Sequence, residues 1–176
     1  SFVSYGENWA NVGNTPYRKF KSQEHEGGIL TPMIAHWPRG IKQGNRLIAD
    51  MVHIIDVMPT CLEVAGVEYP EQFKGNPVLP LDGKSFYPIL HSGPYNPKRV
   101  LFWEHMGNKA IRVNEKKLVK LNNSPWELYN LEHDPTELEN LATREKALAD
   151  SLENVWNNWA ESNGVLDWPI KKTGEM

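Results

Sequence analysis

Lys21, in a polar stretch, is a candidate residue for binding an anion. It lies five positions before Glu26-Gly27-Gly28, within a run rich in charged and hydroxyl side chains. A lysine ammonium is a compact charge on a flexible stem, which suits a tetrahedral oxyanion. When a sulfate or phosphate ester is hydrolysed, negative charge moves onto the leaving oxygen, and fixed cations aimed there supply much of the catalysis. Spacing alone leaves a second interpretation open, since most lysines in polar stretches are solvated surface residues.

The residues after Lys21 indicate how it would be placed. Gly27 and Gly28 permit a tight turn before an apolar run, because glycine reaches backbone conformations closed to other residues. Such a turn would bring Lys21 to the end of a strand, near the crevice where open α/β sheets bind ligands. Glu26 could act as a general base, but we favour the interpretation that it is a hydrogen-bond acceptor that stabilises the fold.

Two histidines and a tryptophan are further candidates for a site. His25 shares the loop with Lys21 and could line the pocket, whereas His36 lies in an apolar run and is interpreted as a core histidine. Trp9, with Asn11 nearby, could stack on a sugar or aryl ring while the amide binds hydroxyl groups. An alternative of equal weight is that Trp9 plugs a loop folded over the domain.

Five segments of the sequence resemble motifs of the sulfatase family. Residues 14–32 are similar to its NTPxRxxKxxxHEGGIxTP segment, and residues 126–142 to the WELYDLxxDPxExxNLA segment that closes many sulfatases. Residues 53–66 and 81–86 match the HxxDxxPTxLxxAG and xDGxSL stretches, and residues 5–11 resemble a stretch of bacterial members. The chain thus resembles the C-terminal part of a bacterial, arylsulfatase-like sulfatase of the alkaline-phosphatase-like superfamily.

The resemblance implies a reaction and a set of site residues. Lys21 would be the catalytic residue that contacts the sulfate group, and Lys21, His25, Trp9 and Asn11 would bind the substrate. The substrate would be a sulfate ester, such as an aryl sulfate or a sulfated glycan, hydrolysed by S–O cleavage. Two alternatives stay open: a phosphonate or phosphate monoester hydrolase of the same superfamily, and a non-catalytic carbohydrate-binding or structural module.

The resemblance also identifies parts of a sulfatase that this sequence lacks. The family's nucleophile is a cysteine or serine converted to formylglycine in a Cys/Ser-x-Pro/Ala-x-Arg motif, which Cys61 does not match. We expect Cys61 to be a buried structural cysteine. The family's calcium would bind upstream residues, so no metal site is expected in this chain, and the chain alone is expected to be inactive. Its partner would be the upstream part of the same protein or a second copy.

Composition excludes two classes of function. The 176 residues carry a formal net charge of -3 and the isoelectric point is near 6.1, whereas a nucleic-acid-binding domain usually has a basic bias. The sequence has no apolar run long enough to predict a membrane span. Hydrophobic residues make up 40% and charged residues 23%, which is typical of a globular domain. By resemblance, the parent protein would be periplasmic or secreted.

The first half of the chain predicts elements of an α/β domain. Residues 1–15 are polar, with glycines and asparagines, and predict a loop. The apolar run at 32–37, ended by Pro38, predicts a buried strand. Residues 56–65 predict a helix that Asp56 caps, with an apolar stripe at spacings of three and four. A turn-rich connector follows this helix.

The second half predicts an antiparallel sheet packed by a helix. Short β-prone runs recur at hairpin spacing, at residues 100–103, 110–113, 118–121 and 126–129. A final helix, capped by Thr143 and ended by Gly164, should lie with its apolar stripe on one face of the sheet. The stripe consists of Leu148, Leu152, Val155, Trp156 and Trp159. We therefore expect an α/β plus α+β chain that forms the C-terminal portion of an alkaline-phosphatase-like sulfatase fold. Residues 1–97 would be the remainder of the catalytic domain. Residues 98–176 would form a subdomain of a four-stranded antiparallel sheet with its final helix.

Overall fold

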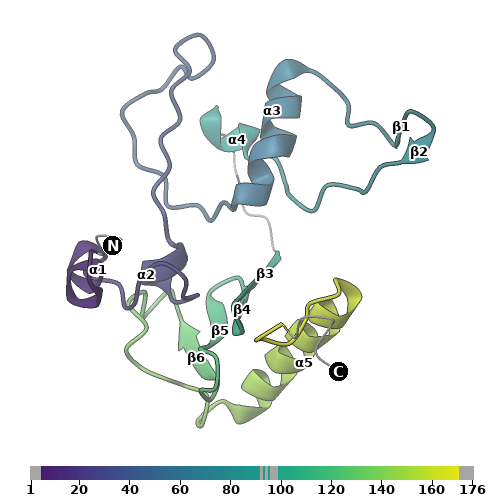
Figure 1. Ribbon diagram of the computed structural model, residues 1–176. Coiled ribbons are helices and arrows are strands. Elements are labelled where there is room, and N and C mark those ends of the chain that lie inside the picture. Colours follow the sequence, from purple (N-terminus) through teal and green to yellow (C-terminus); the bar gives the residue numbers. More distant parts are fainter. Residues whose placement is uncertain (1–4, 92, 94, 96–98, 171–176) are drawn as a thin grey trace. The chain divides into compact units, whose positions relative to one another are not determined.

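The computed structural model describes residues 5–91, 93, 95 and 99–170 (Figure 1). Its contacts divide the chain into two compact units. The sheet unit comprises Ser1–Pro32 and Lys98–Met176, and the helical unit comprises Met33–Pro97. The first segment of the chain therefore groups with the C-terminal sheet. The assignment of residues 1–97 to a catalytic domain stays a prediction.

The sheet unit is built on four antiparallel strands in the order β3-β4-β5-β6. They are β3 (Val100–His105), β4 (Asn108–Val113), β5 (Lys116–Lys120) and β6 (Glu127–Asn130). Each strand pairs with the next along the chain, so the predicted four-stranded sheet is confirmed. The β3–β4 hairpin closes in a two-residue turn, Met106-Gly107, in which both residues have positive φ, a geometry that matches the twist of the strands.

One face of the sheet is covered by α5 (Lys146–Ser162), the final helix that the sequence predicts (Figure 1). The core between them consists of Ile111, Leu118, Leu128, Leu141, Ala149, Leu152, Trp156 and Ala160. Phe102 of β3 stacks on Trp159 with ring centroids 4.7 Å apart. Val155 of the predicted stripe is exposed, and the helix begins later than predicted because residues 142–145 form a turn. Among the described residues, no helix is long and apolar enough to cross a bilayer.

The opposite face of the sheet carries a small apolar cluster beside a row of polar side chains. The cluster consists of Ala110, Val119, Tyr129 and Leu131. The strand register places Arg112, Lys117 and Tyr129 side by side across β4, β5 and β6. This row is contacted by α2 (Glu26–Ile29), which the chain reaches long before it enters the sheet.

A short helix, α1 (Glu7–Gly13), lies where the sequence predicts a loop. The asparagines that favoured the loop instead bond to helix carbonyls. Asn11 Nδ2 donates to the Glu7 carbonyl at 3.1 Å, and Asn14 Nδ2 donates to the Ala10 carbonyl at 2.8 Å. No residue of α1 is buried, so the helix presents its side chains to the outside.

The helical unit holds η1 (Ile54–Asp56), α3 (Val57–Ala65), β1 (Gln72–Phe73), β2 (Asn76–Pro77) and α4 (Tyr87–Leu90). The predicted helix at 56–65 is confirmed as α3, and Gly66 ends it in the left-handed conformation, with φ 63°. Asp56 does not cap α3 with its side chain. Its buried carboxylate accepts hydrogen bonds from the backbone N–H groups of His53, at 2.7 Å, and Lys84, at 2.8 Å.

In the helical unit, residues 53–66 and residues 81–86, two of the family-like segments, are held together by a hydrogen bond and by close packing. Thr60 Oγ1 accepts a hydrogen bond from the Phe86 N–H at 3.0 Å. Gly83 lies so close to the other segment that a Cβ there would come within 2.0 Å of the Ile55 carbonyl oxygen. Only glycine fits at that position without moving the backbone, so this glycine is required by packing.

Three predictions for the helical unit are wrong. Residues 32–37 form no strand, and Ile34 is 93% exposed. A strand needs a neighbour to take its backbone hydrogen bonds, and no described residue pairs with this segment as a strand. His36 and Cys61 are exposed rather than buried, because no described side chains cover them.

We expect the isolated chain to self-associate, or to exchange amide protons quickly in the helical unit. Met58 of α3 is 54% exposed and Ile34 is nearly fully exposed. Exposed apolar side chains of this size favour association when they gather into a patch. Light scattering against concentration, with amide exchange, tests this expectation, and Met58→Gln should weaken the association. A strict monomer with slow exchange over residues 32–37 and 57–65 would contradict it.

Candidate functional site

Lys21 sits at the tip of a four-residue turn, Phe20 to Gln23. The Gln23 N–H donates to the Phe20 carbonyl at 3.2 Å, and Ser22 has a φ of 77°. The side chain of Lys21 is exposed, and it has no ion-pair partner among the residues that the structure describes. Asn108, at the start of β4, donates from Nδ2 to the Ser22 carbonyl at 2.7 Å. A free cation is thus presented on a turn that is tied to the sheet.

The two glycines after the turn are required by close packing of the backbone. A Cβ on Gly27 would lie 2.3 Å from the Arg18 carbonyl oxygen, and one on Gly28 would lie 1.8 Å from the Gln23 carbonyl oxygen. Neither glycine has a positive φ. Glycine is therefore required here by close approach of the backbone and not, as predicted, by unusual backbone angles. Both glycines lie inside the short helix α2, and the described residues 30–53 after it contain no strand, so the predicted turn before a strand is wrong.

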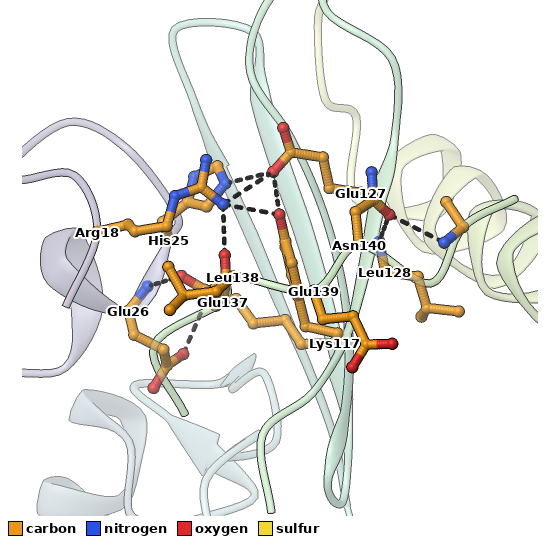
Figure 2. Close-up of polar contacts among 12 residues, drawn as sticks. Arg18, His25, Glu26, Lys117, Glu127, Leu128, Glu137, Leu138, Glu139 and Asn140 are labelled. Carbon is orange, nitrogen blue, oxygen red and sulfur yellow. Dashed lines mark hydrogen bonds and ion pairs between the residues drawn. The ribbon is translucent and has the colours of Figure 1, made fainter. Parts of the chain in front are cut away.

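A buried ion cluster fastens α2 to the sheet (Figure 2). Lys117 Nζ lies 2.7 Å from Glu26 Oε1 and 2.8 Å from Glu137 Oε1, and the side chains of Lys117 and Glu137 are 0% exposed. The Glu26 N–H donates to Glu137 Oε2 at 2.8 Å. Arg112 approaches the second oxygen of Glu26 at 3.8 Å. Glu26 is therefore a structural hydrogen-bond acceptor, as the sequence favours.

A second polar cluster surrounds Glu127 of β6 (Figure 2). His25 Nε2 lies 2.9 Å from Glu127 Oε2, and the Tyr129 hydroxyl donates to the same oxygen at 2.6 Å. The hydrogen bond from His25 holds the pKa of Glu127 at about 2, against the opposing effect of burial, and Tyr129 lowers it further. Arg18 donates to the Tyr129 hydroxyl at 2.8 Å and to the Glu137 carbonyl. Burial is the main reason that the pKa of Tyr129 is raised.

The structure separates the predicted site residues by exposure. His25 is 0% exposed and its Nε2 is bonded to Glu127. Trp9 is 65% exposed, which does not fit a plug, and Asn11 is exposed with its amide bonded within α1. Lys21 is exposed on its turn. The roles of these residues in substrate binding and catalysis stay predictions.

Sequence reasoning missed the residues that hold the site together. Lys117 lies in β5, whose sequence is Lys-Lys-Leu-Val-Lys, and a lysine there predicts a solvated position. Glu137 has a φ of 58° and lies within a turn in which the Asp134 carboxylate accepts from the N–H groups of Leu138 and Glu139. No local pattern marks Lys117 and Glu137 as partners. The Asp-Pro turn itself is predicted correctly as structural.

The described part of the chain contains no candidate metal site. No group of three or more His, Cys, Asp or Glu side chains among those residues could hold a metal ion. The carboxylates of Glu26, Glu127 and Glu137 are instead bonded to Lys117, His25 and a backbone N–H group. The donor set of the described residues does not fit a calcium ion.

Comparisons with known proteins find similarity to sulfatases. A protein-family model described as N-sulphoglucosamine sulphohydrolase, C-terminal, matches residues 19–161. An uncharacterized sulfatase of Schizosaccharomyces pombe is 34% identical over 177 residues, covering 96% of this chain and 32% of its own length. An ulvan-active sulfatase of Formosa agariphila is 31% identical over 173 residues, covering 79% of this chain and 34% of its own length.

The chain is also similar to part of a protein of known structure. The crystal structure of Ps i-CgsB matches with a TM-score of 0.66 and 29% identity, covering 84% of this chain and 32% of that one. The same protein is also known in complex with k-i-k-neocarrahexaose. The chain thus spans about a third of the length of the relatives it matches.

We expect Lys117→Ala to destabilise the protein by about 3–5 kcal/mol, the usual result of removing one partner from a buried ion pair. Glu26 and Glu137 would be left facing each other without a cation. Lys116→Ala is the matched control, because Lys116 forms a more exposed pair with Glu145 and should cost less than about 1 kcal/mol. Urea unfolding followed by tryptophan fluorescence measures both. Equal losses would contradict a special role for the buried cluster.

Glu24 should make stability depend on pH. Burial, with a smaller effect of Glu104, raises its pKa to about 7, and its Oε2 is buried without a hydrogen-bond partner among the described residues. The folded state therefore holds the proton more tightly than the unfolded state, and this contribution to stability is lost as pH rises from about 4.5 to about 7. Glu24→Gln should be more stable than wild type above pH 7, by about 1–2 kcal/mol after allowance for solvent screening.

Thermal unfolding at pH 4 and pH 8 measures this difference. The two proteins should unfold at similar temperatures at pH 4 and separate at pH 8. The control is Glu132→Gln, an exposed position, which should give the same shift at both pH values. A Glu24→Gln variant that is no more stable at pH 8 than at pH 4, relative to wild type, would contradict the prediction.

Proposed function

Since the chain belongs to the sulfatase family through its N-sulphoglucosamine sulphohydrolase C-terminal domain, we propose that it is part of an enzyme that hydrolyses sulfate esters by S–O cleavage. In this enzyme Lys21 contacts the sulfate group. The single observation that supports this role is the free, exposed ammonium on a turn whose two flanks are bonded to the sheet. Such a group can meet an anion without losing an existing partner.

Lys21 would act by charge. Its ammonium would neutralise the oxygens of the bound sulfate and stay in place as negative charge grows on the leaving oxygen. The anchoring of the turn matters here, because a preorganised cation does not have to reorient during the reaction. The nucleophile, which in this family is a formylglycine, and the calcium ion would come from residues outside this chain.

We infer further that the substrate is a carbohydrate sulfate. This is supported by the similarity to an ulvan-active sulfatase and to a protein solved with a neocarrahexaose. Trp9 supports the same inference, since an exposed indole can stack on a sugar ring. Asn11 is a weaker candidate because its amide is bonded within α1. His25 is weaker because it is fully buried, with its Nε2 bonded to Glu127. A periplasmic or secreted location of the whole protein accords with such a substrate.

Lys21→Ala, in a protein that contains this chain with its upstream part, should lower kcat for sulfate release by about a hundredfold to a thousandfold, the scale for losing one donor to an oxyanion. The unfolding temperature should be unchanged, because the Lys21 side chain is exposed and has no ion-pair partner among the described residues. Lys146→Ala is the matched control: it removes the same charge from an exposed position on α5, and kcat should not change.

The measurement uses an aryl sulfate and a sulfated oligosaccharide in parallel with the corresponding phosphonate and phosphate esters. Sulfate release lost in Lys21→Ala and retained in Lys146→Ala supports the proposal. Unchanged kcat in Lys21→Ala refutes it. Faster hydrolysis of the phosphonate or phosphate ester would favour the hydrolase alternative, and binding of the oligosaccharide without turnover would favour the non-catalytic module.

A further inference from the structure

The turn that carries Lys21 is held at its tip by one side chain of the β3–β4 hairpin. Asn108 uses both ends of its amide there. Its Nδ2 donates to the Ser22 carbonyl at 2.7 Å, and its Oδ1 accepts from the Asn122 N–H at 2.8 Å. The two partners fix the orientation of the amide, because a flipped amide would place donor against donor and acceptor against acceptor.

The turn needs such support because its backbone is unfavourable by itself. Ser22 has a φ of 77° and Lys19 a φ of 69°, in a region that residues other than glycine seldom adopt. Arg18 and His25, on either side, are bonded to Tyr129 and Glu127 of β6. The six residues between them therefore form an anchored loop whose middle is bonded to Asn108.

The hairpin that supplies Asn108 is itself rigid. The Gly107 N–H donates to Glu104 Oε1 at 2.9 Å, and a Cβ on Gly107 would lie 2.9 Å from the side chain of Asn122. Asn108 pairs with His105 in the ladder of β3 and β4. A fixed point on the sheet thus meets the turn one residue after Lys21.

We propose that Asn108 is a positioning residue for Lys21, acting through the Ser22 carbonyl, and this rests on the function proposed for Lys21 above. The hydrogen bond holds the peptide that follows Lys21, so it sets the direction in which the lysine side chain leaves the backbone. Asn108 itself touches no substrate. Its loss should lower kcat more than it raises KM, because the lysine would still reach the anion but would no longer be held where charge develops.

Asn108→Asp is the sharpest variant. One carboxylate oxygen can still accept from the Asn122 N–H, while the other cannot donate to the Ser22 carbonyl and repels it. Asn108→Leu removes the same bond without adding charge. Asn123→Asp is the matched control, because Asn123 is exposed, lies beside Asn122 and has a φ of 61° that aspartate also adopts.

Amide exchange in the chain gives the first readout, which does not depend on activity. Both Asn108 variants should speed exchange over residues 18–28 by about tenfold, while exchange in β4 and β5 and the urea midpoint change little. Asn123→Asp should match wild type.

Kinetics in a protein that includes the upstream part give the second readout. Both Asn108 variants should lower kcat by about tenfold to a hundredfold, the scale for a misplaced catalytic group, with KM within about threefold of wild type.

Each result is decisive. Unchanged exchange and unchanged kcat in both Asn108 variants would overturn the proposal, even if Lys21→Ala is inactive as proposed. Equal losses in Asn123→Asp would also overturn it, since added charge or a disturbed hairpin would then explain the effect. If Lys21→Ala leaves kcat unchanged, the proposed function of Lys21 fails, and the exchange result still reports whether Asn108 holds the turn.

Discussion

The buried ammonium of Lys117 constrains one whole face of the sheet. A charge out of contact with water is tolerated only when opposite charges and hydrogen bonds surround it. The two carboxylates that do so come from Glu26, 91 residues earlier in the chain, and Glu137, 20 residues later. The first segment of the chain and the Asp-Pro turn must therefore both be in place before this face of the sheet can close.

The position of the candidate catalytic lysine follows from that constraint. Glu26 and His25 bring the chain to the sheet, and the backbone then packs so tightly that Gly27 and Gly28 admit no side chain. Within this motif the histidine, the glutamate and the glycines serve anchoring, whereas Lys21 is exposed and has no ion-pair partner among the described residues. The motif is therefore mostly a support for one exposed cation.

Buried side-chain oxygens also hold the helical unit together. Asp56, fully buried, accepts backbone hydrogen bonds from His53 and from Lys84, 28 residues further along. Thr60 does the same for Phe86. In both units a buried acceptor from one motif binds a backbone N–H group or a cation from another motif. This explains why segments with family-like sequences need not contribute to chemistry.

Local pattern was sufficient for the four strands, α3, α5 and the Asp-Pro turn, because each follows from spacing that a single segment carries. The apolar stripe of α3 nevertheless stays largely exposed. It was also sufficient to single out Lys21 as a candidate. It failed for residues 32–37, whose apolar run reads as a strand although no described neighbour pairs with it, and for α1. Only the tertiary structure decided the Lys117 cluster and the hydrogen bond from Asn108 to Ser22. Asn108 and Ser22, like Lys117 and Glu26, are about 85 or more positions apart in the sequence. No local sequence pattern encodes a partner at that distance.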